Sequence, residues 1–131
     1  MIALKWVKTA DRFGLMIEQH LKEHFSRLEP EAEQYHPFIH GVYSSLAEYI
    51  LRKGKRLASV YTLITYSGYR GDIDDAILSA CTGIELYRHS ILLHDDLVDG
   101  EDLRRGGRVF QELFESPDER LGNGVAVFTG D

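Results

Sequence analysis

The chain has 131 residues, of which 44% are hydrophobic, 27% are charged and 11% are aromatic. This length suits one domain over residues 1–131, and the composition excludes a disordered tail and a collagen-like repeat. The single cysteine, Cys81, excludes an internal disulfide framework and a cysteine-rich zinc site. No apolar run approaches the roughly 20 residues of a membrane span, and the first residues lack the pattern of a signal peptide, so we expect a soluble, cytoplasmic protein.

The net charge of −6 weighs against nucleic-acid binding, which requires a basic surface. Residues 1–94 hold 11 acids and 11 bases, whereas residues 95–131 hold 10 acids and 4 bases. The whole acidic surplus therefore lies in the C-terminal segment. Its densest part, residues 95–102, directly follows an apolar stretch, and this position calls for an explanation other than a solvated surface.

Helical periodicity covers nearly the whole chain. Apolar residues from Leu4 onward predict a first helix that ends at Pro30. The residue before a proline is disfavoured in a helix, so His36 should mark a break and a second helix should follow it. Gly54 should interrupt that helix, and a third helix should then run from Leu57 to the glycines at positions 68 and 71.

The longest predicted helix starts at Ile73, where Asp72 and Asp74 stand at N-cap positions, and it continues to Asp99. About 27 residues give a helix of about 40 Å. It is apolar on most sides, which is typical of a central, buried helix. A glycine-containing loop, a short helix over residues 109–114 and a last helix over residues 121–131 should follow. We find no convincing strand signal, so the expected class is all-α.

The most informative segment is His-Asp-Asp-Leu-Val-Asp at residues 94–99. Asp95 and Asp99 are one helical turn apart and share a face, while Asp96 lies about 100° away. The three carboxylates repel one another, have apolar neighbours and stand at the C-terminal end of a helix, where negative charge is unfavourable. Binding of Mg²⁺ to carboxylate oxygens would stabilise this arrangement. An exposed acidic helix end is the alternative.

Two other metal sites are excluded by spacing. An EF-hand loop that began at Asp95 would place Leu97 and Gly106 where oxygen ligands are required. His89 and His94 are five residues apart, which is a poor spacing for a zinc site on one helix.

Several cations could bind an anion beside such a metal. Lys55 and Arg56 follow Gly54 at a junction between helices, where free backbone N–H groups favour anions. The surrounding residues do not fit a Walker phosphate loop. Arg104 and Arg105 come shortly after the acidic segment, and Arg88 precedes Asp95 by two turns. Each alone would be read as a surface cation, but together they surround one acidic helix end.

These motifs resemble the trans-isoprenyl diphosphate synthases, the polyprenyl synthetase family. The resemblance covers about residues 38–131. Residues 94–99 match the first aspartate-rich motif DDxxD, and Asp102 and residues 104–106 follow at the family's spacing. Residues 54–57 match the GKR motif, and Glu85 matches a glutamate on the helix that carries the aspartates. Residues 125–131 resemble a helix that ends in Gly-Asp.

The resemblance implies an antiparallel helical bundle of the isoprenoid synthase type, incomplete, with this chain as its N-terminal part. It also implies a Mg²⁺-dependent, head-to-tail condensation of an allylic diphosphate with isopentenyl diphosphate that releases pyrophosphate. Asp95, Asp96 and Asp99 would be catalytic metal ligands. Arg104 would be a catalytic cation that binds the substrate and neutralises the charge of the departing pyrophosphate.

The substrate-binding residues also follow from the resemblance. The diphosphate of the second substrate would be bound by Lys55, Arg56 and Arg105. Arg88 stands where the family has histidine or glutamine, and it could bind a diphosphate as a bidentate donor. The tunnel for the growing chain would be lined by Tyr87, Ser90 and Ile91. Because Ser90 is small, we expect a product longer than farnesyl.

The sequence stops before the family's second aspartate-rich motif, so we expect the isolated chain to be inactive or very weak. The family suggests a homodimer, or a heteromer with a chain that carries the second motif. Two alternatives stay open: a non-catalytic, diphosphate-binding or regulatory subunit of a heteromeric synthase, and a helical protein like the terpene cyclases. The motifs at residues 54–57 and 104–106 count against the latter.

Overall fold

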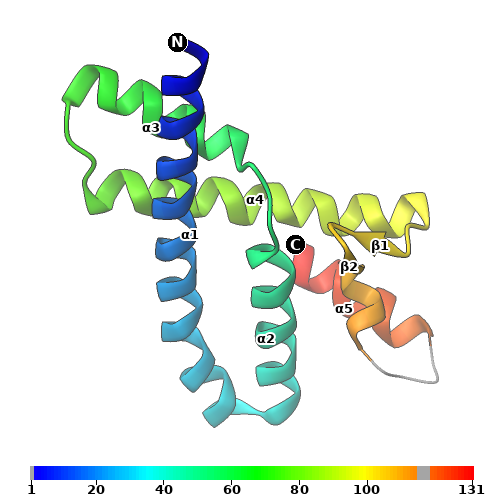
Figure 1. Ribbon diagram of the computed structural model, residues 1–131. Helices are drawn as coiled ribbons and strands as arrows, with labels where there is room; N and C mark the ends of the chain where they lie inside the picture. The colour runs from blue at the N-terminus through cyan, green and yellow to red at the C-terminus, as the bar shows by residue number, and fades with distance from the viewer. Residues whose placement is uncertain (1, 115–118) are drawn as a thin grey trace.

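The computed structural model describes residues 2–114 and 119–131. Its elements are α1 (Ile2–Tyr35), α2 (Pro37–Leu51), α3 (Leu57–Arg70), α4 (Asp75–Asp99), β1 (Leu103–Arg104), β2 (Gly107–Arg108), the 3₁₀ helix η1 (Phe110–Leu113) and α5 (Glu119–Gly130). Figure 1 shows α1 and α2 as an antiparallel pair, with α3 and α4 running across α1. The last helix, α5, lies beside the C-terminal half of α4 (Figure 1).

The core forms where α1 meets the other helices. On α1, residues four apart along the chain are buried on one face: Phe13, Ile17, Leu21 and Phe25. This spacing is the apolar stripe of an amphipathic helix. They cluster with buried side chains from α2, α3 and α4, among them Ile50, Val60, Leu63 and Leu93. The all-α class is confirmed, and none of the helices in the described part of the chain is long and apolar enough to cross a membrane.

The expected end of the first helix at Pro30 is wrong, because α1 continues through this residue to Tyr35. A proline inside a helix removes one backbone hydrogen bond, here to the carbonyl group of Ser26. Ser26 and Pro30 are both exposed, so water can satisfy that carbonyl oxygen. The last turns of α1 bend away from the line of the rest of the helix (Figure 1).

The other helix boundaries follow the predicted signals. The backbone N–H of Phe38 donates to Nδ1 of His36, the N-cap of α2, at 3.1 Å. The Asp74 carboxylate caps α4 by accepting from the N–H of Ile77 at 3.0 Å. Gly71 ends α3 with φ of 85°, a conformation that favours glycine. The N-cap of α4 is thus Asp74 and not Asp72.

Helix α4 is buried along one face and exposed along another. The buried residues are Cys81, Thr82, Glu85, His89, Leu93 and Asp96. Tyr87, Ile91 and Val98 are exposed, which differs from the expected helix buried on most sides. Nothing in the described part of the chain covers that second apolar face. The central position that the sequence predicts for α4 is therefore met on one side only.

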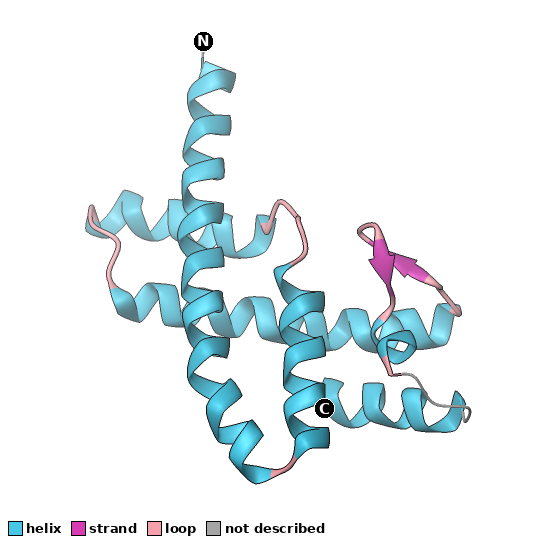
Figure 2. Cartoon of the chain, turned by 60° about the horizontal axis from the view of Figure 1, so that its bottom comes forward, coloured by secondary structure: helices cyan, strands magenta, loops and turns pink. Residues whose placement is uncertain are grey.

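A β-hairpin follows α4 where the sequence predicts only a loop. Leu103 pairs with Arg108 and Arg104 with Gly107, so Arg105 and Gly106 form a two-residue turn. Both turn residues have positive φ, 51° and 78°, as a type I′ turn requires. Figure 2 shows the hairpin at the C-terminal end of α4. The two strands are too short to give a periodic sequence signal.

Two glycines of α5 provide a matched test of packing. A Cβ atom at Gly122 would lie 2.5 Å from the backbone oxygen of Gln111 in η1, whereas one at Gly124 would meet nothing within 4 Å. We expect Gly122→Ala to lower the free energy of unfolding by about 1–3 kcal/mol. Gly124→Ala should leave it unchanged or raise it by up to about 1 kcal/mol, because alanine favours a helix. Urea unfolding followed by circular dichroism measures both, and equal effects would contradict the packing of α5 on η1.

Candidate active site

The acidic segment at the end of α4 divides into two parts. Asp95 and Asp99 are exposed, and within the described residues neither forms an ion pair. Asp96 is fully buried. The structure thus brings Asp95 and Asp99 to one exposed face and turns Asp96 into the protein, and no group of three acidic, histidine or cysteine side chains is placed to hold a metal ion among the described residues.

Asp96 is held by two neighbours. The Tyr49 hydroxyl donates to Oδ2 at 2.8 Å, and Nε of Arg104 donates to Oδ1 at 2.6 Å, with Nη2 of Arg104 on the same oxygen. Burial raises the pKa of Tyr49, and its hydrogen bond to Asp96 raises that pKa further. The same carboxylate raises the pKa of Arg104. Asp96 therefore joins α4 to α2 and to the hairpin, and Arg104 points at Asp96.

Arg52 fixes the hairpin to the end of α2. Its Nη1 donates to the carbonyl oxygens of Arg104 at 3.0 Å and Arg108 at 2.7 Å, while Nε and Nη2 bind the Glu48 carboxylate. The Arg52 guanidinium passes so close to Gly107 that a Cβ atom there would lie 2.5 Å from Cζ. This contact sets the position from which Arg104 and Arg105 reach α4.

Arg56, expected to bind a diphosphate, is only 2% exposed. Its Nη1 lies 3.0 Å from Oε2 of Glu85, and its Nη2 donates to the carbonyl oxygen of Ile50 at 3.0 Å. The Ser59 hydroxyl binds the other oxygen of Glu85. Because Glu85 is fully buried, its charge requires a buried partner, and Arg56 supplies it. In this structure Arg56 is therefore a core ion-pair residue that does not reach solvent.

Three predicted substrate-binding cations lack acidic partners in the described part of the chain. Within the described residues, no carboxylate lies within ion-pair distance of Lys55, Arg88 or Arg105. The guanidinium of Arg105 covers Gly54, where a Cβ atom would lie 2.9 Å from Cζ. Burial lowers the pKa of Arg105, and the nearby charges of Arg88 and Arg56 lower it further. Crowded cations without counter-ions favour binding of an anion.

Arg88 shares a helix face with the exposed acids. Asp95 follows Arg88 by seven residues and Asp99 by eleven, and both spacings bring a side chain back to nearly the same direction. The rise of the helix separates Arg88 from Asp95 by about 10 Å along its axis. One face of α4 thus presents a cation and, further along, two carboxylates, which suits an anion that also contacts a divalent cation.

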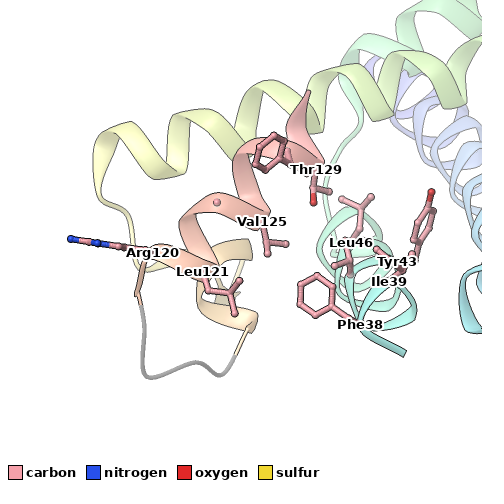
Figure 3. Close-up of a pocket in the computed structure, with 11 residues that line it drawn as sticks. Phe38, Ile39, Tyr43, Leu46, Arg120, Leu121, Val125 and Thr129 are labelled. Carbon is pink, nitrogen blue, oxygen red and sulfur yellow. The ribbon is translucent and has the colours of Figure 1, made fainter. Parts of the chain in front are cut away.

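Two apolar cavities adjoin this region. Tyr87 and Ser90 line a pocket of about 280 Å³ together with Leu46, Ile50 and Thr129. Ile91, also expected there, is exposed and does not line it. A larger groove of about 550 Å³ lies between α2 and α5. Figure 3 shows its opposing side chains, among them Phe38 and Leu46 on α2 and Leu121 and Val125 on α5.

The C-terminal Gly-Asp pair packs against α4. A Cβ atom at Gly130 would collide with Nε2 of His94, so the glycine permits the close approach of the two helices. His94 Nε2 lies 3.3 Å from the carbonyl oxygen of Val127 and 3.7 Å from Oδ1 of Asp131. Asp131 is thereby placed beside the residue that precedes Asp95.

Sequence reasoning missed three residues that shape the site: Tyr49, Arg52 and His89. Tyr49 has the spacing of an apolar helix face, and only its hydroxyl, which needs a partner when buried, could have indicated a polar contact. His89 was considered only as a zinc ligand. It is 1% exposed and contacts both Glu85 and Arg105.

The fold and the site together define an all-α protein of the isoprenoid synthase fold. A geranylgeranyl pyrophosphate synthase from Corynebacterium glutamicum, crystallised with isoprenyl diphosphate and magnesium, superposes with a TM-score of 0.78 at 22% identity, over 92% of this chain and 38% of that one. Residues 40–131 match the family model of the polyprenyl synthetases. The chain therefore belongs to the polyprenyl synthetase family.

Two curated relatives have similar sequences. The chain is 27% identical over 120 residues to the short chain isoprenyl diphosphate synthase of Methanocaldococcus jannaschii, which covers 92% of this chain and 34% of the relative. It is 29% identical over 113 residues to heptaprenyl diphosphate synthase component 2 of Bacillus subtilis, with coverage of 85% and 30%. The chain spans about a third of the length of these relatives.

Proposed function

We propose that this chain forms the part of a prenyltransferase that binds the allylic diphosphate through Mg²⁺ and binds isopentenyl diphosphate through cations. The proposal rests chiefly on Arg88, Arg105 and the exposed Asp95 and Asp99, none of which forms an ion pair among the described residues. Cations and acids that lack ion-pair partners among the described residues, on one face of α4 and in the adjoining hairpin, suit a ligand that carries several negative charges. The reaction would join the two substrates head to tail and release pyrophosphate.

The exposed carboxylates fit Mg²⁺. Asp95 and Asp99 offer oxygen atoms one turn apart on a solvent-accessible face, and Mg²⁺ is usually bound by one or two carboxylates with water and substrate phosphates. When bound, Mg²⁺ would neutralise the developing charge of the diphosphate leaving group. Asp96 was predicted as a third ligand. In the position that it has here, it acts on the site by holding Arg104.

The other residues would bind and shield the substrates. Lys55, Arg88 and Arg105 would bind the diphosphate of isopentenyl diphosphate. Arg104, which Asp96 holds in position at the hairpin, would contact the allylic diphosphate. Tyr87 and Ser90 would contact the hydrocarbon chain in an apolar pocket that excludes water from the carbocation. The small Ser90 favours a product longer than farnesyl.

Turnover would require a second acidic cluster from the rest of a longer chain or from a partner subunit, in a homodimer or heteromer. A second candidate function is a diphosphate-binding subunit without turnover of its own. The Bacillus subtilis relative is named as one component of a synthase, and this name supports a function within a multi-component assembly.

Calorimetric titration of the chain with inorganic pyrophosphate tests the proposal. We expect pyrophosphate to bind at least about tenfold more tightly with excess Mg²⁺ than with a chelator, because metal and diphosphate share the site, and the linkage must be reciprocal. Preformed magnesium pyrophosphate and metal-free pyrophosphate are compared at equal ionic strength to control for screening. Equal affinity in the two titrations, or no binding, would overturn the proposal.

A further inference from the structure

The position of His89 fixes one of its ring protons. Nδ1 of His89 lies 2.7 Å from the backbone carbonyl oxygen of Glu85. A carbonyl oxygen only accepts hydrogen bonds, so Nδ1 must carry the proton. In the neutral ring the other nitrogen, Nε2, is then an acceptor. The ring is nearly fully buried and packs edge-to-face against Tyr49, with centroids 6.0 Å apart.

The surroundings of His89 favour the neutral ring. Burial lowers the pKa of His89, and the charges of Arg105 and Arg56 lower it further. The backbone hydrogen bond to Glu85 and the Glu85 carboxylate, 3.9 Å from Nδ1, act in the opposite direction but are outweighed. These groups come from α4, from the hairpin and from the segment that precedes α3. The Tyr49 hydroxyl on α2, which belongs to the ring packed against His89, donates its hydrogen bond to Asp96.

The free acceptor of His89 meets an unpaired cation. Nη1 of Arg105 lies 3.4 Å from Nε2 of His89, so the guanidinium donates to the ring. This is the only hydrogen bond of Arg105 to a side chain among the described residues. Arg105 also has φ of 51°, which directs its side chain from the hairpin turn back over Gly54.

We propose that neutral His89 is a positioning residue that holds the Arg105 guanidinium over Gly54, in the orientation in which it binds a diphosphate. The inference rests on the proposed function, because it assumes that Arg105 contacts the diphosphate. A neutral acceptor can orient the guanidinium without cancelling its charge, whereas a carboxylate in the same place would form an ion pair and compete with the anion. Glu85 contributes through its backbone oxygen, which sets the tautomer of His89.

Substitutions at His89 separate orientation from packing. His89→Leu keeps an apolar side chain but removes the acceptor, whereas His89→Gln places an amide oxygen near the position of Nε2. We expect the affinity for metal-free pyrophosphate to fall about tenfold in His89→Leu and to stay within about threefold of the wild-type value in His89→Gln. Calorimetry measures both, with circular dichroism as the check on folding.

A double-mutant cycle with Arg105→Gln identifies the route of the effect. If His89 acts through Arg105, the double variant His89→Leu/Arg105→Gln binds pyrophosphate as weakly as Arg105→Gln alone. Additive losses would overturn the inference. If Arg105→Gln has no effect on pyrophosphate affinity, the proposed function itself fails at this residue. If Arg105→Gln weakens binding and His89→Leu does not, only the role of His89 is refuted.

Nuclear magnetic resonance of the wild-type protein gives an independent test that needs no folded variant. The ¹⁵N shifts and two-bond couplings of the imidazole distinguish the two neutral tautomers and the charged ring. We expect a protonated Nδ1 and an unprotonated Nε2 for His89 at neutral pH. A proton on Nε2 would leave no acceptor for Arg105 and would overturn the inference.

Discussion

Asp95→Asn and Asp99→Asn are each expected to abolish the linkage between Mg²⁺ and pyrophosphate binding. Asparagine preserves the size of the side chain but removes the negative charge and one of the strong oxygen ligands that Mg²⁺ prefers. We expect Mg²⁺ to change the pyrophosphate affinity of either variant less than about twofold, against at least about tenfold in the wild type. Calorimetry with magnesium pyrophosphate and with metal-free pyrophosphate measures this difference.

The expected result is specific to the exposed acids at one end of α4. Asp75→Asn removes a carboxylate that is also exposed but lies at the other end of the same helix, so the linkage in this variant should equal that of the wild type. Asp96→Asn should instead lower the free energy of unfolding, because Arg104 and Tyr49 lose a buried charged partner. Retention of the full linkage in Asp95→Asn and Asp99→Asn would exclude these residues as metal ligands.

The second large effect is expected in the core. Glu85→Leu should lower the free energy of unfolding by about 3–5 kcal/mol, since it leaves the charge of Arg56 buried without a partner. Both side chains are almost completely buried, and Arg56 Nη1 lies 3.0 Å from Oε2 of Glu85. Nε of Arg56 already lacks a hydrogen-bond partner, so little remains to compensate the guanidinium. Urea unfolding followed by circular dichroism measures the loss.

A matched double variant shows whether the unpaired charge is the cause. In Glu85→Leu/Arg56→Met both charges are replaced by apolar side chains of similar size. Such replacements of a whole buried ion pair are often neutral or stabilising. We therefore expect the double variant to be more stable than Glu85→Leu. Lost volume or altered packing would not produce this gain in stability. A double variant as unstable as Glu85→Leu would show that the loss comes from packing.

Most helix boundaries could be read from the sequence because they depend on local chemistry. The restriction before Pro37, the positive φ of Gly71 and the capping carboxylate of Asp74 each act within a few residues. The predicted helix end at Pro30 was wrong because the effect of a proline on a helix depends on the exposure of the freed carbonyl group. A proline ends a helix unless the freed carbonyl group can reach water, and that is decided by how α1 lies on the rest of the protein.

The candidate site was predictable in composition but not in arrangement. The acids and cations were identified by their types and spacing, and the offset of Asp96 by about 100° from Asp95 was visible in the sequence. Which carboxylate becomes buried depends on the helices that pack against α4, and this is a tertiary property. Arg56 was predicted to bind a diphosphate for the same reason: its partner Glu85 lies 29 residues away along the chain, so their ion pair could not be read from the local sequence.

The hairpin carries a consequence for sequence variation. In the run from Arg104 to Gly107, each position meets a separate structural requirement: an ion pair with the buried Asp96, a donor to His89, a φ of 78° at Gly106, and the close approach of the Arg52 guanidinium to Gly107. A substitution at any one of the four positions therefore breaks the requirement of that position. In a saturation library screened for folded, pyrophosphate-binding variants, these four neighbours should form the most intolerant window outside the helices, with Leu103 and Glu101 at its permissive edge.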